Sequence, residues 1–229
     1  MKDPIVSIVV PCYNQAQYLD EALQSVSDQI FENWECIVVN DGSSDNAEQI
    51  ARKWIEQDVR FKYYYQENGG VSSARNLGIA NSVGEFILPL DGDDKIAKDY
   101  IKLAIRAFEN DESLKLVYCK AEKFGDETGN WNLRPFSLKE LALDNMIFCS
   151  AIYRKKDWEL IGGYDNNMLD GLEDWEFWIS LLKNGGNVSC LNTIGFYYRI
   201  KLVSRQKKLD GTIKEKLFNY LSIKHQKGN

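Results

Sequence analysis

The sequence predicts an α/β fold in which a mostly parallel central sheet is flanked by helices. Runs of β-branched residues alternate with amphipathic helical stripes through the first 110 residues, which is the pattern of repeated strand, turn and helix units. The chain has 229 residues, of which 44% are apolar, so it can bury a large core. It shows no internal repeat or low-complexity tract.

The first unit starts with an almost continuous apolar run over residues 5–10, as a strand buried on both faces requires. Pro11 ends that strand. The helix that follows presents one apolar stripe, formed by Leu19, Ala22, Leu23 and Val26.

The next units repeat this order. We expect strands over residues 35–39, 61–65 and 85–90, and a helix over residues 71–80 after a Gly-Gly pair. Two further helical stripes are formed by Ile50, Ala51, Trp54 and Ile55, and by Tyr100, Leu103, Ala104, Ala107 and Phe108.

Beyond about residue 120 the pattern changes. Residues 123–131 are polar and Gly-rich, which indicates a mobile loop. Helices are expected near 137–145 and 174–184, and residues 187–200 are expected to be extended. A final helix would present Ile213, Leu217, Tyr220 and Leu221 on one face.

The composition excludes several classes of function. With 28 Lys and Arg against 34 Asp and Glu, the net charge is −6, so no basic face for nucleic acid is evident. His225 is the one histidine, which argues against two-histidine zinc sites and Ser-His-Asp triads. The five cysteines are widely spaced and are expected to be buried thiols in a reducing compartment.

Polar residues follow three of the predicted strands. These segments are Pro11-Cys12-Tyr13-Asn14, Asn40-Asp41-Gly42-Ser43-Ser44-Asp45 and Asp91-Gly92-Asp93-Asp94. In an open parallel sheet the ligand crevice lies at the carboxyl ends of the strands, so these segments would converge. Each one alone could equally be an ordinary turn.

The third segment carries three carboxylates, Asp91, Asp93 and Asp94, in four residues. Like charges this close repel unless a cation or a set of hydrogen-bond donors offsets them. Oxygen ligands without His or Cys suit Mg²⁺ or Mn²⁺, which are commonly held by carboxylates together with substrate phosphates. A diphosphate ligand is therefore expected, with Arg75 as a further cation to attract it.

These segments, with three later ones, resemble the family 2 glycosyltransferases, nucleotide-sugar-dependent enzymes of the GT-A fold. The resemblance covers roughly residues 5–200. It rests on the segments 6–14, 39–45, the Gly-Gly-Val-Ser-Ser-Ala-Arg-Asn-Leu-Gly string at 69–78, the Asp-x-Asp at Asp91 and Asp93, and the strings at 161–165 and 172–177.

The resemblance implies a role for each matching residue on the donor side. Pro11 and Tyr13 would line the base pocket, with Tyr13 stacked on the uracil or other ring, and Asp41 would accept a hydrogen bond from the base edge. Arg75 would lie near the nucleotide. In the segment Asp91-Gly92-Asp93, Asp91 would contact the ribose and Asp93 the metal ion, Mn²⁺ or Mg²⁺, that bridges the phosphates.

On the acceptor side, Asp174 matches the family's Glu-Asp pair and would act as the base that deprotonates the attacking hydroxyl. Glu173 and Trp175 would contact the acceptor. Direct displacement inverts the anomeric centre, and the metal stabilises the departing diphosphate. Residues 123–131 and the segment after Tyr198 are candidate lids that exclude water.

The implied organisation is a single domain, 1–229, with a nucleotide-binding half at 1–120, an acceptor-binding half at 121–205 and a C-terminal tail or helix at 206–229. One departure concerns the metal: where many relatives place a histidine after a Tyr-Arg pair, this chain has Lys201. Lys201 or Arg205 would then contact the diphosphate and lower the dependence on a cation. Lys207 and Lys208 are expected to be a solvated basic stretch.

Other functions are less consistent with the sequence. A Gly-x-Gly-x-x-Gly dinucleotide loop, an NTPase phosphate loop and the Gly-rich loop of nucleotidyltransferases are all missing after the first strand. The remaining alternative is a nucleotide-sugar-binding module without turnover in a polysaccharide assembly complex.

The partners expected for an enzyme are a nucleotide-sugar donor, most simply a UDP-sugar, and a saccharide or lipid-linked acceptor in cell-surface polysaccharide synthesis. No segment matches a signal peptide or a spanning helix, so we expect a cytoplasmic protein. A lipid-linked acceptor would bring it to the inner face of the membrane through its C-terminal segment, whose apolar stripe is expected instead to be core.

Overall fold

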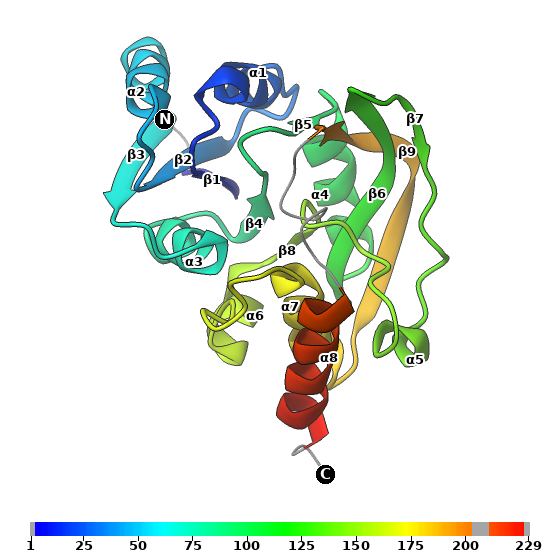
Figure 1. The fold of residues 1–229 in the computed structure, drawn as a ribbon. Helices are drawn as coiled ribbons and strands as arrows, with labels where there is room; N and C mark the ends of the chain where they lie inside the picture. Colours follow the sequence, from blue (N-terminus) through cyan, green and yellow to red (C-terminus); the bar gives the residue numbers. More distant parts are fainter. Residues whose placement is uncertain (1–2, 203–210, 227–229) are drawn as a thin grey trace.

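A computed structural model describes residues 3–202 and 211–226, and its central feature is a nine-stranded sheet flanked by helices (Figure 1). The strands are β1 (Val6–Cys12), β2 (Trp34–Asp41), β3 (Phe61–Gln66), β4 (Phe86–Pro89), β5 (Lys95–Ile96), β6 (Leu114–Gly125), β7 (Gly129–Trp131), β8 (Ile152–Arg154) and β9 (Asn187–Ile200). The helices are α1 (Ala16–Ser27), α2 (Ala47–Gln57), α3 (Val71–Ala80), α4 (Tyr100–Asn110), α5 (Leu138–Leu141), α6 (Lys155–Ile161), α7 (Glu173–Leu182) and α8 (Gly211–Gln226).

Strands β3, β2, β1 and β4 lie side by side and are all parallel, as the alternating pattern predicts. The apolar run of β1 is buried at every position because both faces of the sheet are covered. Val6, Ile8 and Val10 face the cluster that contains the apolar stripes of α1, α2 and α4, whereas Val9 faces a second cluster on the other side. Helix α3 packs on β1 and β2 on the opposite side from α1 and α2 (Figure 1).

The second half of the sheet is mixed rather than parallel. Strand β8 runs antiparallel to both of its neighbours, β4 and β6, whereas β6 pairs with β9 in parallel. The long strands β6 and β9 curl away from β1–β3 (Figure 1), with shifts in register at residues 114–116 and 119–121. The mostly parallel arrangement therefore holds for β1–β4, whereas the rest of the sheet is mixed.

The prediction that residues 123–131 form a mobile loop is wrong, because part of this segment is a paired β-strand. Residues 121–123 and 129–131 form a β-hairpin between β6 and β7, with Ala121 opposite Trp131. The Trp131 ring packs edge-on against Phe148 and Tyr198, at centroid distances of 4.8 and 4.4 Å. This apolar anchor outweighs the polar, Gly-rich composition of the segment.

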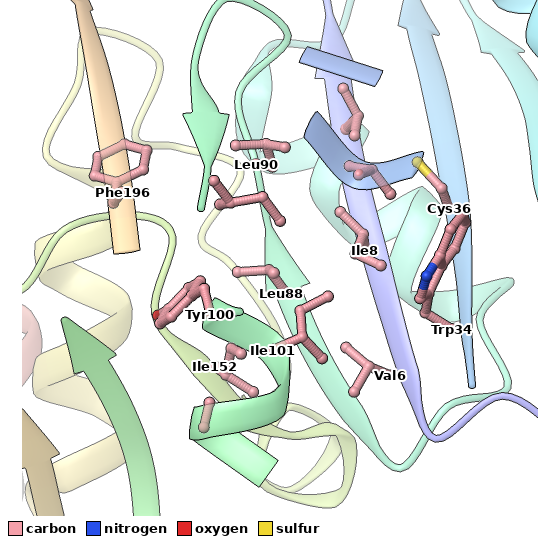
Figure 2. Close-up of a cluster of buried hydrophobic side chains, with 14 of the residues drawn as sticks. Val6, Ile8, Trp34, Cys36, Leu88, Leu90, Tyr100, Ile101, Ile152 and Phe196 are labelled. Atoms are coloured by element: carbon pink, nitrogen blue, oxygen red, sulfur yellow. The ribbon is translucent and has the colours of Figure 1, made fainter. Parts of the chain in front are cut away.

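One hydrophobic core joins the two halves (Figure 2). Side chains of β1, β2, β4 and α4 meet Ile152 of β8 and Phe196 of β9 in it. Tyr100 is fully buried, and its hydroxyl donates to the Ser150 carbonyl oxygen at 2.8 Å. Burial of each large apolar side chain contributes about 1.5–3 kcal/mol to the free energy of folding. The packed core therefore holds the strands, and with them their carboxyl ends, in fixed positions.

The final helix forms as expected, and Leu217 and Leu221 of its predicted stripe are buried. The prediction is wrong for Tyr220, which is 36% exposed and donates to Asp165 Oδ2 at 2.7 Å. Across the described ranges no helix has both the length and the apolar character that crossing a membrane requires. All five cysteines are free, and Cys12, Cys36 and Cys119 are buried as expected. The expectation is wrong for Cys190, which is exposed.

Candidate functional site

The three strand ends that the sequence singles out lie next to one another at one edge of the sheet. Pro11 of β1 is in register with Val39 of β2, and on the other side the Leu90 N–H donates to the Val9 carbonyl oxygen at 3.0 Å. The strand order β2-β1-β4 therefore places Asp41, Tyr13 and Asp91 at the same edge. Gly92 lies close to the neighbouring strand, because an added Cβ would be 2.9 Å from Gln15 Oε1 and 3.3 Å from the Pro11 carbonyl oxygen.

Tyr13 follows β1 and is 51% exposed, whereas Pro11 is buried. The next residue, Asn14, has a φ of 52°, a left-handed conformation that is uncommon outside glycine. Hydrogen bonds to the loop after β2 hold it: the Asn14 N–H donates to Ser43 Oγ at 3.0 Å, and the Ser44 N–H donates to Asn14 Oδ1 at 2.8 Å. The two loops thus fix the backbone that presents the Tyr13 ring to solvent.

Asp41 is buried and its carboxylate accepts four hydrogen bonds from the chain. Oδ1 accepts from Gln66 Nε2 at 2.6 Å and from the Gly69 N–H at 2.8 Å, and Oδ2 accepts from the Gly70 N–H at 3.0 Å and from Asn68 Nδ2 at 3.2 Å. These bonds hold the Gly-Gly turn that leads into α3. A carboxylate has about four acceptor directions, so each one already has a donor.

Arg75 lies on α3 and is buried, with 1% of its surface exposed. Its guanidinium donates to Asp91 Oδ1 at 2.7 Å and to Glu173 Oε1 at 3.0 Å, and it lies over the ring of Tyr164 at 5.3 Å. The predicted residues Arg75, Asp91 and Glu173 are therefore brought into contact across 98 residues of sequence. Arg75 is therefore a buried link between two elements and not a solvated helix residue.

The residue after Arg75 ties α3 to the Gly-Gly-Tyr-Asp string. Asn76 Oδ1 accepts from the Tyr164 N–H at 2.8 Å, and Asn76 Nδ2 donates to the Tyr164 carbonyl oxygen at 2.8 Å. Tyr164 in turn stacks on Phe177 of α7, with ring centroids 4.0 Å apart. No function of Asn76 or Tyr164 follows from the sequence alone, because paired amide contacts of this kind leave no local signal.

The acidic loop after β4 is only partly neutralised. Asp91 is paired with Arg75, and Asp93 forms a close ion pair with Lys201. Asp94 Oδ1 accepts from the Arg199 N–H at 2.8 Å, but its buried Oδ2 has no hydrogen-bond partner within the described residues. Burial, and then the charges of Asp93 and Asp91, hold the pKa of Asp94 well above its usual value.

A cluster of possible metal ligands lies in this loop. One carboxylate oxygen from each of Asp91 and Asp94 and the sulfur of Cys149 all lie within 4.8 Å of one another. Burial and then the Asp91 charge keep the pKa of the Cys149 thiol well above its usual value, so the thiol is neutral. The two carboxylates fit a hard divalent cation, whereas the expected ligand Asp93 is engaged by Lys201.

Asp174 lies in the first turn of α7, and the helix is preceded by a strained residue. Leu172, the residue before the helix, has a φ of 60°. Asn145 Nδ2 donates to Asp174 Oδ2 at 3.2 Å. Burial, and then the neighbouring charge of Glu173, raise the pKa of Asp174 to about 6. A carboxylate with this pKa is a stronger base than an ordinary aspartate and is still ionised at neutral pH.

The two residues expected to contact the acceptor are both buried. Glu173 is paired with Arg75, and Trp175 is 2% exposed, with its indole N–H donating to the Leu141 carbonyl oxygen at 2.6 Å. Asn145 and Cys149, which lie against Asp174 and Asp91, have no role in the site that the sequence pattern predicts. The helix expected near 137–145 instead ends at Leu141, and Asn145 lies beyond it. The predicted residues Arg205, Lys207 and Lys208 lie outside the described part of the chain.

Comparison with known proteins identifies the family and the fold of this chain. The profile described as Glycosyl transferase family 2 matches residues 7–169. The chain is 40% identical over 129 residues to a putative glycosyltransferase, EpsH, of Bacillus subtilis, covering 56% of this chain and 37% of the relative. It is 27% identical over 215 residues to the chondroitin synthase of Pasteurella multocida, covering 90% of this chain and 22% of that protein. The chain thus spans well under half the length of these relatives.

Solved structures show the same fold. The S. aureus TarS fragment 1–349 in complex with UDP-GlcNAc superposes with a TM-score of 0.76 at 22% identity, covering 94% of this chain and 66% of that one. The mannosyltransferase PcManGT of Pyrobaculum calidifontis, in complex with GDP-Man and Mn²⁺, superposes with a TM-score of 0.72 at 18% identity, covering 91% and 60%. The family profile covers most of the chain and the GT-A fold is shared, so this protein belongs to glycosyl transferase family 2.

Proposed function

We propose that this protein transfers a sugar from a nucleoside diphosphate donor to a hydroxyl group of a saccharide acceptor. One observation carries the proposal: the buried guanidinium of Arg75 joins Asp91, at the end of β4, to Glu173, at the start of α7. The acidic loop and the candidate base Asp174 therefore belong to one site. They come from the two halves expected for donor and acceptor, 1–120 and 121–205.

The reaction is a direct displacement at the anomeric carbon. The acceptor hydroxyl oxygen forms a bond to that carbon as the bond to the diphosphate oxygen breaks, and the electron pair leaves with the nucleoside diphosphate. The hydroxyl proton goes to Asp174, whose raised pKa suits it to act near neutral pH. Attack from the face opposite the leaving group inverts the anomeric centre.

For the donor, we propose that Tyr13 stacks on the base above Pro11. Tyr13 is exposed and its backbone is held by the neighbouring loop, which favours a planar ligand. A base N–H reaching Asp41 would compete with the longest of its four hydrogen bonds, that from Asn68. The TarS complexes with UDP and UDP-GlcNAc support a UDP-sugar, and the GDP-Man complex makes GDP the second choice.

Asp91 and Asp94 are the residues that would hold Mn²⁺ or Mg²⁺, because a carboxylate oxygen of each lies within 4.8 Å of the other and Asp94 Oδ2 has no hydrogen-bond partner within the described residues. When bound, such an ion stabilises the negative charge that develops on the leaving diphosphate. Asp93, the metal ligand that the resemblance implies, would instead act on the same diphosphate through Lys201.

For the acceptor, the names of the chondroitin synthase and of a similar hyaluronan synthase support a growing polysaccharide. A lipid-linked saccharide would place the enzyme at the membrane face. Glu173 and Trp175 are buried, so their effect on the acceptor would come through the position of Asp174.

The test is transfer activity of Asp174→Asn with a panel of nucleotide sugars and saccharide acceptors. We expect nucleotide release to fall by about 10²- to 10⁴-fold while donor binding is unchanged. The matched control is Asp170→Asn, an exposed aspartate four residues earlier. If the parent binds a donor but neither hydrolyses nor transfers it, the protein is a nucleotide-sugar-binding module and not an enzyme.

A further inference from the structure

We propose that the ammonium group of Lys201 is a built-in counter-ion for the donor diphosphate, so that this protein binds nucleoside diphosphates without a divalent metal ion. The inference deepens the proposed function and rests on it. The two residues involved are Lys201, which directly follows strand β9, and Asp93, which Lys201 contacts.

The first observation is the ion pair itself. Lys201 Nζ contacts the carboxylate of Asp93, and the side chains are 23% and 12% exposed. The pair is therefore largely shielded from water but still reachable from solvent. A contact in this setting is screened less than an ordinary surface salt bridge, so the charge of Lys201 acts on its surroundings.

The second observation is that the backbone around Lys201 is fixed. The Arg199 N–H donates to Asp94 Oδ1 at 2.8 Å, and the Leu202 N–H donates to Asp126 Oδ2 at 2.7 Å. The Asp126 N–H donates to the Ile200 carbonyl oxygen at 3.0 Å. Since residues on both sides of Lys201 are held, its reach to Asp93 is a property of the fold.

The third observation is how the other nearby cations are used. Arg75 is buried between Asp91 and Glu173. The Arg199 guanidinium contacts Glu21, donates to the Asp93 carbonyl oxygen at 2.8 Å, and lies over the rings of Tyr18 and Phe124. Both guanidiniums are thus held by protein groups. Lys201 also has protein contacts, because its ammonium lies 5.3 Å from the centre of the Tyr18 ring as well as against Asp93. An ammonium presents three N–H donors, so the group that meets Asp93 can bridge this carboxylate and a phosphate oxygen.

The charge balance of the loop points the same way. Carboxylates in this loop would repel a diphosphate, and Lys201 offsets the charge of Asp93, whose side chain is 12% exposed. A divalent ion at Asp93 would have to displace this ammonium, because the two cations would repel each other at contact distance. An ion at Asp91 and Asp94 leaves the pair intact and adds to donor binding instead of being required for it.

The experiment is a titration of the intact chain with UDP and GDP by isothermal calorimetry, in EDTA and in Mn²⁺. We expect the parent to bind one of them in EDTA. The Lys201→Ala variant should lose at least about tenfold in affinity in EDTA and recover most of it in Mn²⁺, since a charge-assisted hydrogen bond contributes roughly this much. Lys201→Arg should retain metal-free binding.

Two further variants separate this role from a structural one. Lys95→Ala removes a nearby lysine that pairs with Glu21. This variant should leave nucleotide affinity unchanged both in EDTA and in Mn²⁺. Lys201→His replaces the ammonium by a metal ligand, so direct Mn²⁺ binding, followed by electron paramagnetic resonance without nucleotide, should tighten relative to the parent.

The outcomes are distinct. Binding of UDP or GDP by the parent only when Mn²⁺ is present, with Lys201→Ala unchanged, overturns the role of Lys201 and leaves the proposed function standing. Absence of binding to either nucleotide in both conditions overturns the proposed function as well.

Discussion

The guanidinium of Arg75 donates to Asp91 Oδ1 at 2.7 Å from a position that is 99% buried, in the middle of the candidate site. Glu173 lies on its other side at 3.0 Å. Two carboxylates from opposite halves of the chain thus share one cation. This arrangement fixes the distance between the end of β4 and the start of α7.

We expect Arg75→Met to destabilise the protein by about 3–5 kcal/mol, because removing one partner of a buried ion pair leaves the other charges uncompensated. The free energy of unfolding in urea measures this. The control is Arg52→Met, which breaks the exposed pair with Glu48 and should cost less than about 1 kcal/mol. Equal losses for the two variants would contradict the role of Arg75 as a buried link.

Asp174 should control the pH dependence of transfer. Its pKa is about 6, so the base is protonated and inactive below that pH, and the rate should rise with pH through about 6 and then level off. The pH profile of the transfer rate at saturating donor measures this. Asp174→Asn should lose this limb, and a parent profile that is flat between pH 5 and 7 would contradict the assignment.

The same substitution should raise stability at neutral pH. The folded-state pKa of Asp174 lies above its unfolded value, so the folded state binds the extra proton and stability falls as pH rises from about 4 to about 6. Asp174→Asn removes this loss of stability. We expect the free energy of unfolding to rise by about 2 kcal/mol at pH 7.5 and to change little at pH 4. Urea unfolding at both pH values checks it; a loss of stability at pH 7.5 would show that the charge is stabilising.

Gly42 should be intolerant of a side chain. Its φ is +73°, and an added Cβ would lie 2.7 Å from the Asn68 backbone nitrogen, next to the turn that Asp41 holds. Gly162 has a similar φ of +83° with nothing within 4 Å of an added Cβ. We expect Gly162→Ala to cost about 1 kcal/mol and Gly42→Ala at least about 1 kcal/mol more.

The two glycine variants are compared by urea unfolding, and UDP affinity is measured in parallel. Gly42→Ala should also weaken UDP binding because the Asp41 loop shifts, whereas Gly162→Ala should leave it unchanged. Equal free energies of unfolding for the two variants would show that the backbone conformation alone sets the cost.

Trp175→Phe tests how the helix under Asp174 is held. The indole N–H of Trp175 donates to the Leu141 carbonyl oxygen at 2.6 Å within the core. Losing this bond should cost about 1–2 kcal/mol, because the carbonyl is left without its partner. Transfer assays should then show an unchanged acceptor KM; a KM raised tenfold without loss of stability would instead place Trp175 in contact with the acceptor.

The local sequence pattern determined the strands and helices of the first half of this protein. The β-branched run at 5–10 and the stripe of Leu19, Ala22, Leu23 and Val26 are short-range signals, and both elements form. The prediction that Pro11 ends the strand is wrong, because β1 continues through Pro11 to Cys12 in register with β2. The strand at 187–200 is found with the same bounds. The convergence of Tyr13, Asp41 and Asp91 on one edge also follows from strand order, because parallel strands end at the same side of a sheet.

Only the tertiary structure decided how charges are shared within the site. That Arg75 pairs with Glu173, that Asp93 meets Lys201 and that Asn145 supports Asp174 each depend on segments 29 to 108 residues apart. The same applies to the hairpin at 121–131, which forms because Trp131 finds Phe148 and Tyr198. Composition and periodicity report local preference, whereas the partner of a buried charge or ring is set by long-range packing.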